Sequence, residues 1–249
     1  MIFRRALRAV LPQAIALRAR REWLARRVVR GKGYKERDVE LLPRLLKPTD
    51  ICWDIGANSG TYTAPMSRLA AQVFAFEPVP HNFEILETVL RLGHLTNVSA
   101  RQLAISDANG MARMAIPVDG FYGGYYMAAF DDRGTLEVPT ATIDGLIHDG
   151  VPEPDFIKCD VEGAEVRVVE GARTLIARRH PIWLLETFED SVLALMESLG
   201  YSTYVHAEGG GLLRVGARTE ARNYLFLPTD RPFPCALTTR PETGRGQSG

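Results

Sequence analysis

The sequence predicts one α/β domain whose mostly parallel sheet is covered by helices on both faces, and three observations predict it. Strand-like and helical segments alternate between residues 50 and 200, the order that gives parallel strands joined by crossover helices. The final two strand-like segments have no helix between them, so this last pair should be antiparallel. With 249 residues, 46% hydrophobic and 24% charged, the chain can bury one full core.

Each element is predicted by a local pattern. Short apolar runs predict strands, and apolar residues at helical spacing predict the helices between them. Pro48 stops a short helix over 38–50, and Gly93 ends the helix that follows the second strand. The predicted strands are 50–56, 72–78, 98–106, 156–163, 181–187, 201–215 and 223–228, and the predicted helices are 61–70, 81–93, 165–179 and 191–200.

The segment from Asp107 to Asp144 is irregular. Residues 105–117 predict a hairpin whose turn runs from Asp107 to Gly110. Residues 118–132 are rich in aromatic residues and glycine. Long irregular insertions beside a parallel sheet tend to be functional, so we expect the substrate to bind here.

Residues 1–37 differ from the rest of the chain, because they hold twelve Lys/Arg against two Glu. They predict one or two basic amphipathic helices, which could pack on the domain, lie on an anionic membrane surface or contact phosphate-bearing ligands. We expect residues 38–230 to form the α/β domain and residues 231–249 to be disordered. The apolar residues near helical spacing in the first region are Leu7, Val10, Leu11, Ile15, Trp23, Leu24 and Val28.

The charge and the cysteine content limit the possible binding partners and the cellular compartment. The formal net charge is +0, so residues 38–249 carry ten more acidic than basic residues, which disfavours nucleic acid as a partner. Cys52, Cys159 and Cys235 have no metal-ligand spacing, and the first two lie in apolar strands. Without a run of about 20 apolar residues or a convincing signal peptide, we expect a cytoplasmic protein that could lie peripherally at a membrane.

The stretch "DIGANSG" at the end of the first strand indicates a ligand site, because ligands bind beyond the carboxyl ends of parallel strands. Gly56 and Gly60 let the backbone approach a ligand, and Asn58 tolerates an unusual conformation while offering an amide. A dinucleotide pyrophosphate is anionic and would be repelled by Asp54. The cationic amino group of S-adenosylmethionine would instead be attracted.

A second carboxylate supports this interpretation. Glu77 ends the second strand, where an acidic side chain can accept hydrogen bonds from both hydroxyl groups of a ribose. Taken alone, Glu77 indicates only an adenosine ribose, which nicotinamide and S-adenosylmethionine sites share. Together with Asp54 and the antiparallel last pair, it favours S-adenosylmethionine as the cofactor.

The chain resembles the FkbM family of S-adenosylmethionine-dependent methyltransferases. The segments "DIGANSGTYT", "VFAFEPVPHNFEIL", "NVSARQLAISDANG", "FIKCDVEGAEVRVVEGA" and "PIWLLET" carry the resemblance from Asp50 to Thr187, and "NYLFLP" is a weaker match. The resemblance implies a class I Rossmann-like methyltransferase fold of seven strands with an antiparallel last strand. It also implies transfer of a methyl group to a hydroxyl oxygen of a sugar, glycan or secondary metabolite.

The resemblance also implies roles for individual residues. Glu77 would hold the ribose. The adenine would meet Asp107 or the backbone of Ile105 and Ser106, although Asp107 is equally explained as the cap of a turn. The methionine-binding turn would comprise Asp54, Gly56, Asn58 and Gly60.

Methyl transfer to an alcohol needs alignment of two atoms and removal of the hydroxyl proton. Lys158, Asp160 and Glu162 end the fourth strand on one nominal side, and Glu186 ends the fifth. We therefore expect these four residues to be catalytic, because converging acids can raise the pKa of a general base. His81 and His206 are further candidates near the crevice, although a plain strand position explains His206 as well.

Several alternatives stay open. The same acids could hold a divalent metal ion, although we expect none. The basic arm could serve an RNA methyltransferase, or the chain could be a non-catalytic cofactor-binding module in a biosynthetic assembly. Glu165 and Glu170 are expected to be helix surface charges or first-turn charges that favour the helix N-terminus, and Trp53 and Trp183 to be core residues.

Overall fold

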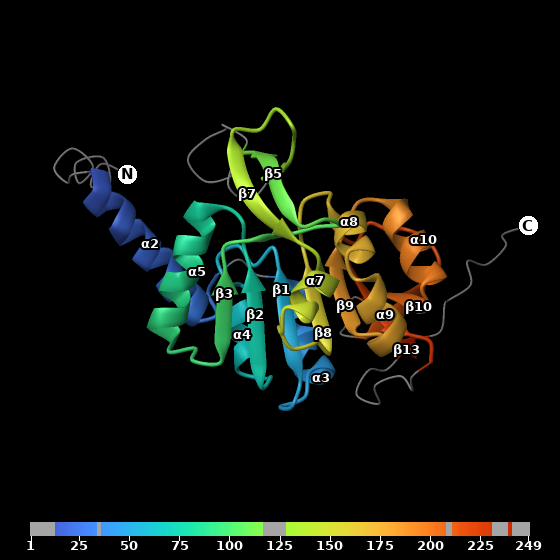
Figure 1. Ribbon diagram of the computed structural model, residues 1–249. Coiled ribbons are helices and arrows are strands. Elements are labelled where there is room, and N and C mark those ends of the chain that lie inside the picture. Colours follow the sequence, from blue (N-terminus) through green and yellow to red (C-terminus); the bar gives the residue numbers. More distant parts are fainter. Residues whose placement is uncertain (1–12, 34–35, 117–127, 208–210, 231–238, 241–249) are drawn as a thin grey trace, which may run out of the picture.

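The computed structural model describes residues 13–33, 36–116, 128–207, 211–230 and 239–240. A nine-stranded sheet forms its centre (Figure 1). The strands are β1 (Ile51–Ile55), β2 (Gln72–Phe76), β3 (Val98–Arg101), β8 (Phe156–Cys159), β9 (Ile182–Glu186), β10 (Tyr201–His206), β11 (Leu212–Val215), β12 (Asn223–Pro228) and β13 (Thr239–Arg240). Their order across the sheet is β13-β11-β10-β12-β9-β8-β1-β2-β3.

The predicted antiparallel last strand is confirmed. β12 runs antiparallel to both β9 and β10, while β1, β2, β3, β8 and β9 are parallel to their neighbours in this group. The sheet is larger than the seven predicted strands, because residues 201–215 form two strands. β10 and β11 pair antiparallel, and Ala207 N donates to Gly211 O at 2.8 Å where the chain reverses. β13 adds to β11 at the edge.

Helices cover both faces of the sheet, as predicted (Figure 1). Side chains alternate along β1, so that the buried Trp53 and Ile55 face one side and Cys52 the other. The first face packs against α7 (Ile143–His148), α8 (Glu165–Glu170), α9 (Arg173–Arg179) and α10 (Asp190–Ser198). The second packs against η1 (Arg37–Leu41), α3 (Leu42–Leu45), α4 (Thr63–Ser67) and α5 (Pro80–Gly93). The predicted core positions of Trp53 and Trp183 are confirmed.

The helix predicted over 165–179 is divided into α8 and α9 at Gly171. A Cβ added to Gly171 would lie 2.2 Å from the carbonyl oxygen of Ser106. Asp144 N also donates to Gly171 O at 2.9 Å. The helix therefore breaks where two distant segments approach its backbone, which helical periodicity does not reveal.

We expect Gly171→Ala to lower the free energy of unfolding by about 1–3 kcal/mol, because the new methyl group overlaps backbone that cannot easily move. Urea denaturation measures the change. Gly216→Ala is the matched control, since a Cβ there meets nothing within 4 Å, and it should change stability by less than about 0.5 kcal/mol. Equal stability of the two variants would contradict the close approach at Gly171.

The predicted hairpin around residues 107–110 is wrong. The predicted third strand ends at Arg101, and a second sheet follows, made of β4 (Ala104–Ile105), β5 (Gly110–Ala115), β6 (Ala129–Phe130) and β7 (Leu136–Ala141). β7 lies between β4 and β5. The turn residue Asn109 accepts a hydrogen bond from Thr142 N at 2.8 Å, so the turn binds the chain after β7 and does not close a hairpin. Residues 117–127 of this insertion lie outside the described part.

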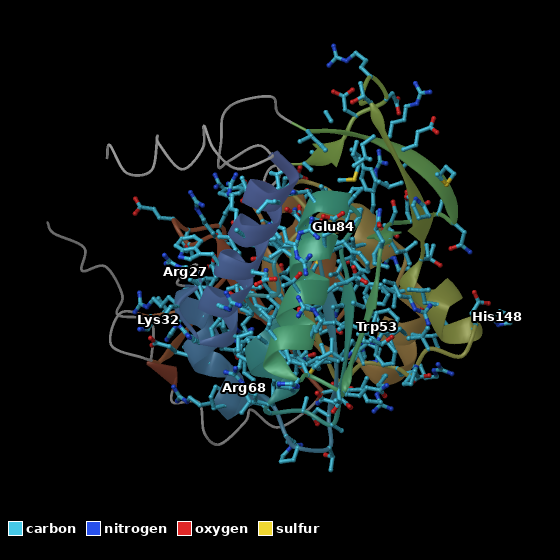
Figure 2. The ribbon with its side chains drawn as sticks, turned by 90° about the vertical axis from the view of Figure 1, so that its left-hand side faces the viewer. Arg27, Lys32, Trp53, Arg68, Glu84 and His148 are labelled. Carbon is cyan, nitrogen blue, oxygen red and sulfur yellow. The ribbon has the colours of Figure 1, made fainter. Side chains whose placement is uncertain are left out.

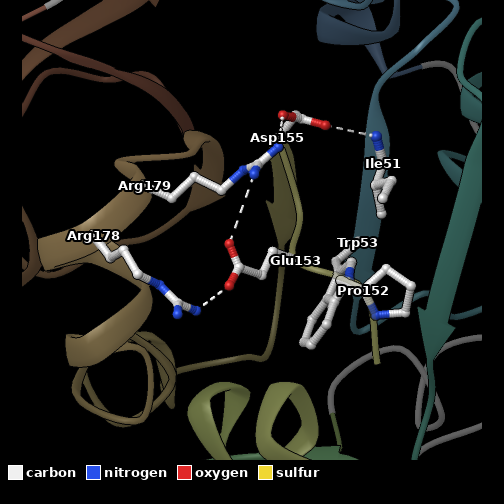
Figure 3. Close-up of polar contacts among 7 residues, drawn as sticks. All are labelled: Ile51, Trp53, Pro152, Glu153, Asp155, Arg178 and Arg179. Atoms are coloured by element: carbon white, nitrogen blue, oxygen red, sulfur yellow. Dashed lines mark hydrogen bonds and ion pairs between the residues drawn. The ribbon is translucent and has the colours of Figure 1, made fainter. Parts of the chain in front are cut away.

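The amino-terminal ends of β1 and β8 are held together by charged side chains (Figure 3). Asp155 accepts from Ile51 N at 2.9 Å and from Arg179 Nη2 at 2.6 Å. Glu153 forms ion pairs with Arg178 and Arg179. These contacts tie α9 to the end of the sheet opposite the carboxyl ends of the parallel strands.

The basic N-terminal region contains α2 (Gln13–Val29), which packs on the outer side of α5 (Figure 2). Ala25 and Val28 contact Ala64 and Val89, and Arg21 forms an ion pair with Glu84. The contact face differs from the predicted stripe, because Trp23 and Ile15 are exposed. The other predicted residues Leu7, Val10 and Leu11 lie outside the described residues. No helix in the described part of the chain is long and apolar enough to cross a membrane.

Candidate functional site: a cleft at the carboxyl ends of β1, β2 and β8

An open cavity lies where β1, β2 and β8 end. The insertion covers one side of it with Met114, Ala128 and Phe130. Five of the predicted site residues line the cavity: Gly56, Asn58, Glu77, Asp160 and Glu162.

The glycine turn after β1 has a backbone conformation that other residues could not adopt easily. Gly56 has φ +75°, and a Cβ there would lie 1.8 Å from Asp160 O. Gly60 has φ +85° and packs against the side chain of Leu86. Gly56 N and Ala57 N both donate to Phe76 O, so the turn lies directly against β2. Glycine therefore permits close contact of the ends of β1, β2 and β8.

Glu77 is the polar centre of this turn. Its side chain is only 4% exposed, and it accepts hydrogen bonds from Asn58 N at 2.7 Å and Val79 N at 2.9 Å, and from Asn82 Nδ2 at 3.4 Å. Burial raises the pKa of Glu77 to about 7, against the lowering effect of these donors. A carboxylate has about four acceptor sites, so Oε2 retains one for a ligand hydroxyl group.

Asp54 is the second-last residue of β1 and lies beneath the turn. It is 2% exposed and accepts a hydrogen bond from Thr63 Oγ1 at 2.5 Å. Burial raises its pKa to about 6, while Thr63 and Lys158 lower it. The described residues that line the cavity do not include Asp54. Asp54 therefore lies on the side of the sheet that α4 covers, beneath the residues that line the cavity.

Ser106 and Asp107 are also displaced from the cavity. Ser106 is buried and donates from Oγ to Asp107 Oδ1 at 3.0 Å. Asp107 is exposed. The neighbouring Leu103, Ala104 and Ile105 line the cavity instead. Of the contacts considered for adenine, the structure brings Ile105 to the cleft and leaves the two polar side chains outside it.

The cleft fits S-adenosylmethionine in two respects. Asn58 has φ +48°, and its Oδ1 atom is buried without a hydrogen-bond partner among the described residues. A buried polar atom without a partner is costly, and Asn58 lines the cavity, so a ligand donor could satisfy it. Leu103, Ile105 and Phe130 supply an apolar wall suited to a nucleobase.

A buried lysine adjoins the cleft. Lys158 is 1% exposed, and its Nζ atom donates to Cys159 O at 3.2 Å and lies 3.8 Å from Asp160 Oδ2. The same ammonium group is 4.9 Å from the centre of the Tyr62 ring. Lys158 and Asp160 thus lie on one side of β8, as the alternation predicted. The buried Tyr62 hydroxyl has no partner among the side chains and backbone described.

Four further carboxylates surround Lys158. Burial, followed by the charge of Asp160, raises the pKa of Glu186 to about 7, while Lys158 lowers it. The pKa of Glu162 is raised to about 6 for the same two reasons. Glu36 and Asp38 also have raised pKa values through burial, and Lys158 lowers both. The predicted catalytic residues Lys158, Asp160, Glu162 and Glu186 therefore belong to one electrostatic cluster.

Sequence reasoning missed Glu36 and Asp38. Asp38 belongs to η1, and its Oδ1 atom lies 3.4 Å from Nδ1 of the buried His206. Asn223, at the start of β12 and opposite Glu186 in register, also hydrogen bonds to Asp38. No local signal could have found this group, because η1, β9, β10 and β12 meet only in the folded chain. His81 is partly exposed beside Arg20 and Arg21.

Glu165 lies in the first turn of α8, one of the two positions predicted, but it is buried and is not a surface charge. Its Oε1 atom accepts from Val161 N at 3.3 Å and Gly163 N at 3.1 Å, which shapes the loop after β8. Glu170 is partly exposed and pairs with Arg173. Within the described ranges, no group of three or more His, Cys, Asp or Glu side chains is placed to hold a metal ion.

The fold and the cleft together define a class of protein. β12 inserts antiparallel between β9 and β10, and a glycine turn with a buried acid joins the ends of β1 and β2. These features define a class I methyltransferase domain. The chain belongs to the FkbM methyltransferase family, because residues 54–203, more than half of it, match the model of the Methyltransferase FkbM domain. The predicted family and fold are confirmed, and with them S-adenosylmethionine as the cofactor.

Individual relatives agree with this family. Hexuronic acid methyltransferase AglP of Haloferax volcanii is 32% identical over 138 residues, which cover 55% of this chain and 56% of that protein. 31-O-demethyl-FK506 methyltransferase FkbM of Streptomyces tacrolimicus is 25% identical over 245 residues, with 80% and 90% covered. The crystal structure of methyltransferase FkbM from Methylobacillus flagellatus has the same fold, with a TM-score of 0.51 and 19% identity over 73% of this chain.

The compared proteins differ in length from this chain. The match spans 56% of the length of AglP and 44% of the crystallised chain. The family match begins at residue 54, so α2, η1 and α3 lie outside it. The compared proteins therefore do not define the acceptor of this chain.

Proposed function

We propose that the protein transfers a methyl group from S-adenosylmethionine to a hydroxyl oxygen of a sugar, glycan or secondary metabolite. One observation carries the proposal: the cleft that contains Glu77 and the glycine turn opens, through Asp160 and Glu162, onto the carboxylate cluster around Lys158. A nucleotide-binding cleft and groups able to accept a proton thus share one edge of the sheet.

Residues of the turn would hold the cofactor. Oε2 of Glu77 would accept a ribose hydroxyl group, and Oδ1 of Asn58 would accept a donor from the ligand. Gly56 and Gly60 would let the turn pack closely against Asp160 O and Leu86, in the conformation that brings Asn58 to the cleft. Asp54 would act from beneath the turn through its charge, with Thr63 holding its carboxylate. When bound, the cofactor supplies a methyl group on a positively charged sulfur atom.

Glu186 is the proposed general base. Its pKa of about 7 is suited to removing a hydroxyl proton near neutral pH. Asp160 is paired with Lys158 at 3.8 Å, so Asp160 and Glu162 would orient the acceptor by accepting hydrogen bonds from its other hydroxyl groups. Lys158 would limit the mutual repulsion of the carboxylates and thereby keep Glu186 able to ionise at neutral pH.

The charge of the cluster indicates the acceptor. Five carboxylates, Glu36, Asp38, Asp160, Glu162 and Glu186, surround Lys158, and Arg222 also lowers the pKa of Glu36 and Glu162. Many carboxylate acceptors suit a ligand rich in hydroxyl donors and disfavour phosphate groups. This supports a small-molecule or glycan acceptor over RNA. The names of the relatives, which mention hexuronic acid and the 31-O position of FK506, agree with an oxygen acceptor.

Calorimetric titration with S-adenosylhomocysteine and with NAD tests the cofactor. We expect micromolar binding of the first alone, because Asp54 disfavours a pyrophosphate. Tritiated S-adenosylmethionine, incubated with a panel of methyl hexosides, uronides and polyketide alcohols, then tests the acceptor class. Binding of NAD in place of S-adenosylhomocysteine, or of neither, would contradict the proposal. Binding of S-adenosylhomocysteine with transfer to RNA and none to the panel would refute the acceptor class alone.

A further inference from the structure

The outer face of α2 has no partner in the part of the chain that the structure describes, and its composition is unusual. Trp23 is 47% exposed. Arg26, Arg27 and Arg30 follow Trp23 by three, four and seven residues, the spacings that share one side of a helix. The opposite side carries Ala25 and Val28, which are buried against the domain. α2 therefore exposes one aromatic side chain to solvent, with three arginines on the same side of the helix.

Hydrogen bonds and a ring contact hold several cationic side chains in place on this side of the molecule. The Arg27 guanidinium lies 4.9 Å from the Trp23 ring centre, and its Nε donates to Lys32 O at 2.9 Å. Arg68 donates to Val29 O at 2.8 Å. Figure 2 shows Arg27, Lys32 and Arg68 on the face of the molecule that α2 and α5 form. Two acidic residues of this region are paired with arginines of α2: Glu22 with Arg18 and Arg26, and Glu84 with Arg21.

Two more apolar side chains are exposed nearer the start of the helix, and Ile15 lies on the side that faces Arg26. Ile15 is 50% exposed and Leu17 is 47% exposed. Two of the five large apolar residues exposed in the described chain thus precede Trp23 on the same helix. An arrangement of arginines beside tryptophan and aliphatic side chains is typical of helices that lie in the interface of an anionic membrane.

We propose that the outer face of α2 docks the protein on an anionic lipid surface. Phosphate headgroups bind Arg26, Arg27, Arg30 and Lys32, while Trp23 and Ile15 enter the interfacial region. Charge distribution orients the protein, because residues 38–249 carry ten more acidic than basic residues and an anionic surface repels them. Single-stranded nucleic acid is less favoured, because Arg27 already occupies one face of the Trp23 ring, on which a base would stack.

The protein carries its own spectroscopic probe. Of its three tryptophans, Trp53 and Trp183 are fully buried and only Trp23 is exposed. A blue shift of tryptophan emission on adding vesicles therefore reports the environment of Trp23. We expect this shift, together with flotation of the full chain, with vesicles of phosphatidylcholine and phosphatidylglycerol at 0.1 M salt. Pure phosphatidylcholine should give neither, and 0.5 M salt should weaken both.

Substitutions on α2 and elsewhere distinguish binding through this surface from a general effect of net charge. The double substitution Arg27→Glu with Arg30→Glu should lower the vesicle partition coefficient at least about 20-fold, and Trp23→Ser should lower it several-fold and abolish the emission shift. The matched control, Arg214→Glu with Arg218→Glu, reverses two charges at the opposite edge of the sheet and should bind as the wild type does. Thermal unfolding of each variant checks its fold.

Three outcomes would overturn the proposal: no flotation with anionic vesicles, equal binding to neutral vesicles, or loss of binding in the control variant to the same extent. An emission shift with a single-stranded RNA oligonucleotide and none with vesicles would identify a nucleic-acid surface and refute lipid docking. None of these results depends on the acceptor or on methyl transfer.

Discussion

Replacement of Glu77 by glutamine is expected to weaken binding of S-adenosylhomocysteine about 10- to 100-fold, the value of one or more hydrogen bonds to a charged group. Three donors, Asn58 N, Val79 N and Asn82 Nδ2, converge on the two carboxylate oxygens. A glutamine offers one oxygen and turns an NH₂ group toward at least one of these donors. The turn would shift, and the remaining acceptor site for a ribose hydroxyl group would be lost. Calorimetric titration of both proteins measures the loss.

Glu87→Gln is the matched control for this experiment, because Glu87 is an exposed residue of α5, the helix that begins three residues after Glu77. It should bind S-adenosylhomocysteine with wild-type affinity. Circular dichroism would establish that the Glu77→Gln variant is folded. Wild-type affinity in a folded Glu77→Gln variant would exclude Glu77 from the ribose site.

Replacement of Glu186 by glutamine is expected to lower the rate of methyl transfer by about 10²–10⁴, the usual contribution of a positioned base, while S-adenosylhomocysteine affinity stays unchanged. The rate of the wild-type enzyme should rise with pH and level off above about 7, because Glu186 accepts a proton only when ionised and its pKa is about 7. The raised pKa results first from burial and then from the charge of Asp160. Glu36 and Glu162 add to it, and Lys158 opposes it.

The acceptor that reacts fastest in the panel serves for this rate profile, and ¹³C NMR of labelled glutamate reports the pKa of Glu186 directly. In the Glu186→Gln variant the rise near pH 7 should disappear. Glu189→Gln is the control, since Glu189 is exposed three residues further on and should leave both rate and profile unchanged. A Glu186→Gln variant that retains the wild-type rate and pH profile would assign the base to another carboxylate.

The same pKa shifts affect stability. The pKa values of Glu77 and Glu186 in the folded protein are raised above the value of 4.5 expected for an unfolded chain. The folded state thus binds more protons than the unfolded state between about pH 4.5 and 7. The stabilising effect of these protons is complete below pH 4.5 and is lost as the pH rises through about 7. A ligand that favours the ionised carboxylates offsets part of this loss.

Local patterns were sufficient where the determinant is local. The strand ends at Asp54, Glu77, Asp160 and Glu186 could be predicted, because apolar runs terminate there and parallel strands end at one edge of the sheet. The glycine turn could be predicted because Gly56 and Gly60 adopt positive φ values that few other residues tolerate. The family resemblance rests on these same segments.

The remaining features depend on contacts between distant segments. Periodicity over 165–179 predicts one helix, but Ser106 O approaches Gly171 and divides it. The turn at Asn109 resembles a hairpin turn, yet it binds Thr142 and admits β7 between the flanking strands. Glu165 has the spacing of a surface residue and is buried because two backbone N–H groups of the preceding loop require an acceptor.

The sequence by itself therefore determined the α/β class, the positions where strands end, and the nucleotide-binding character of the turn, because chain-local periodicity and glycine conformation encode them. Only the tertiary structure decided that Asp54 faces α4 beneath the turn, and that Glu36, Asp38 and His206 join Lys158 at the same edge of the sheet. The physical reason is that burial and the charge of neighbours depend on which segments meet in space. For η1 and β8, more than 100 residues apart in the chain, that meeting is decided by the packing of the whole sheet.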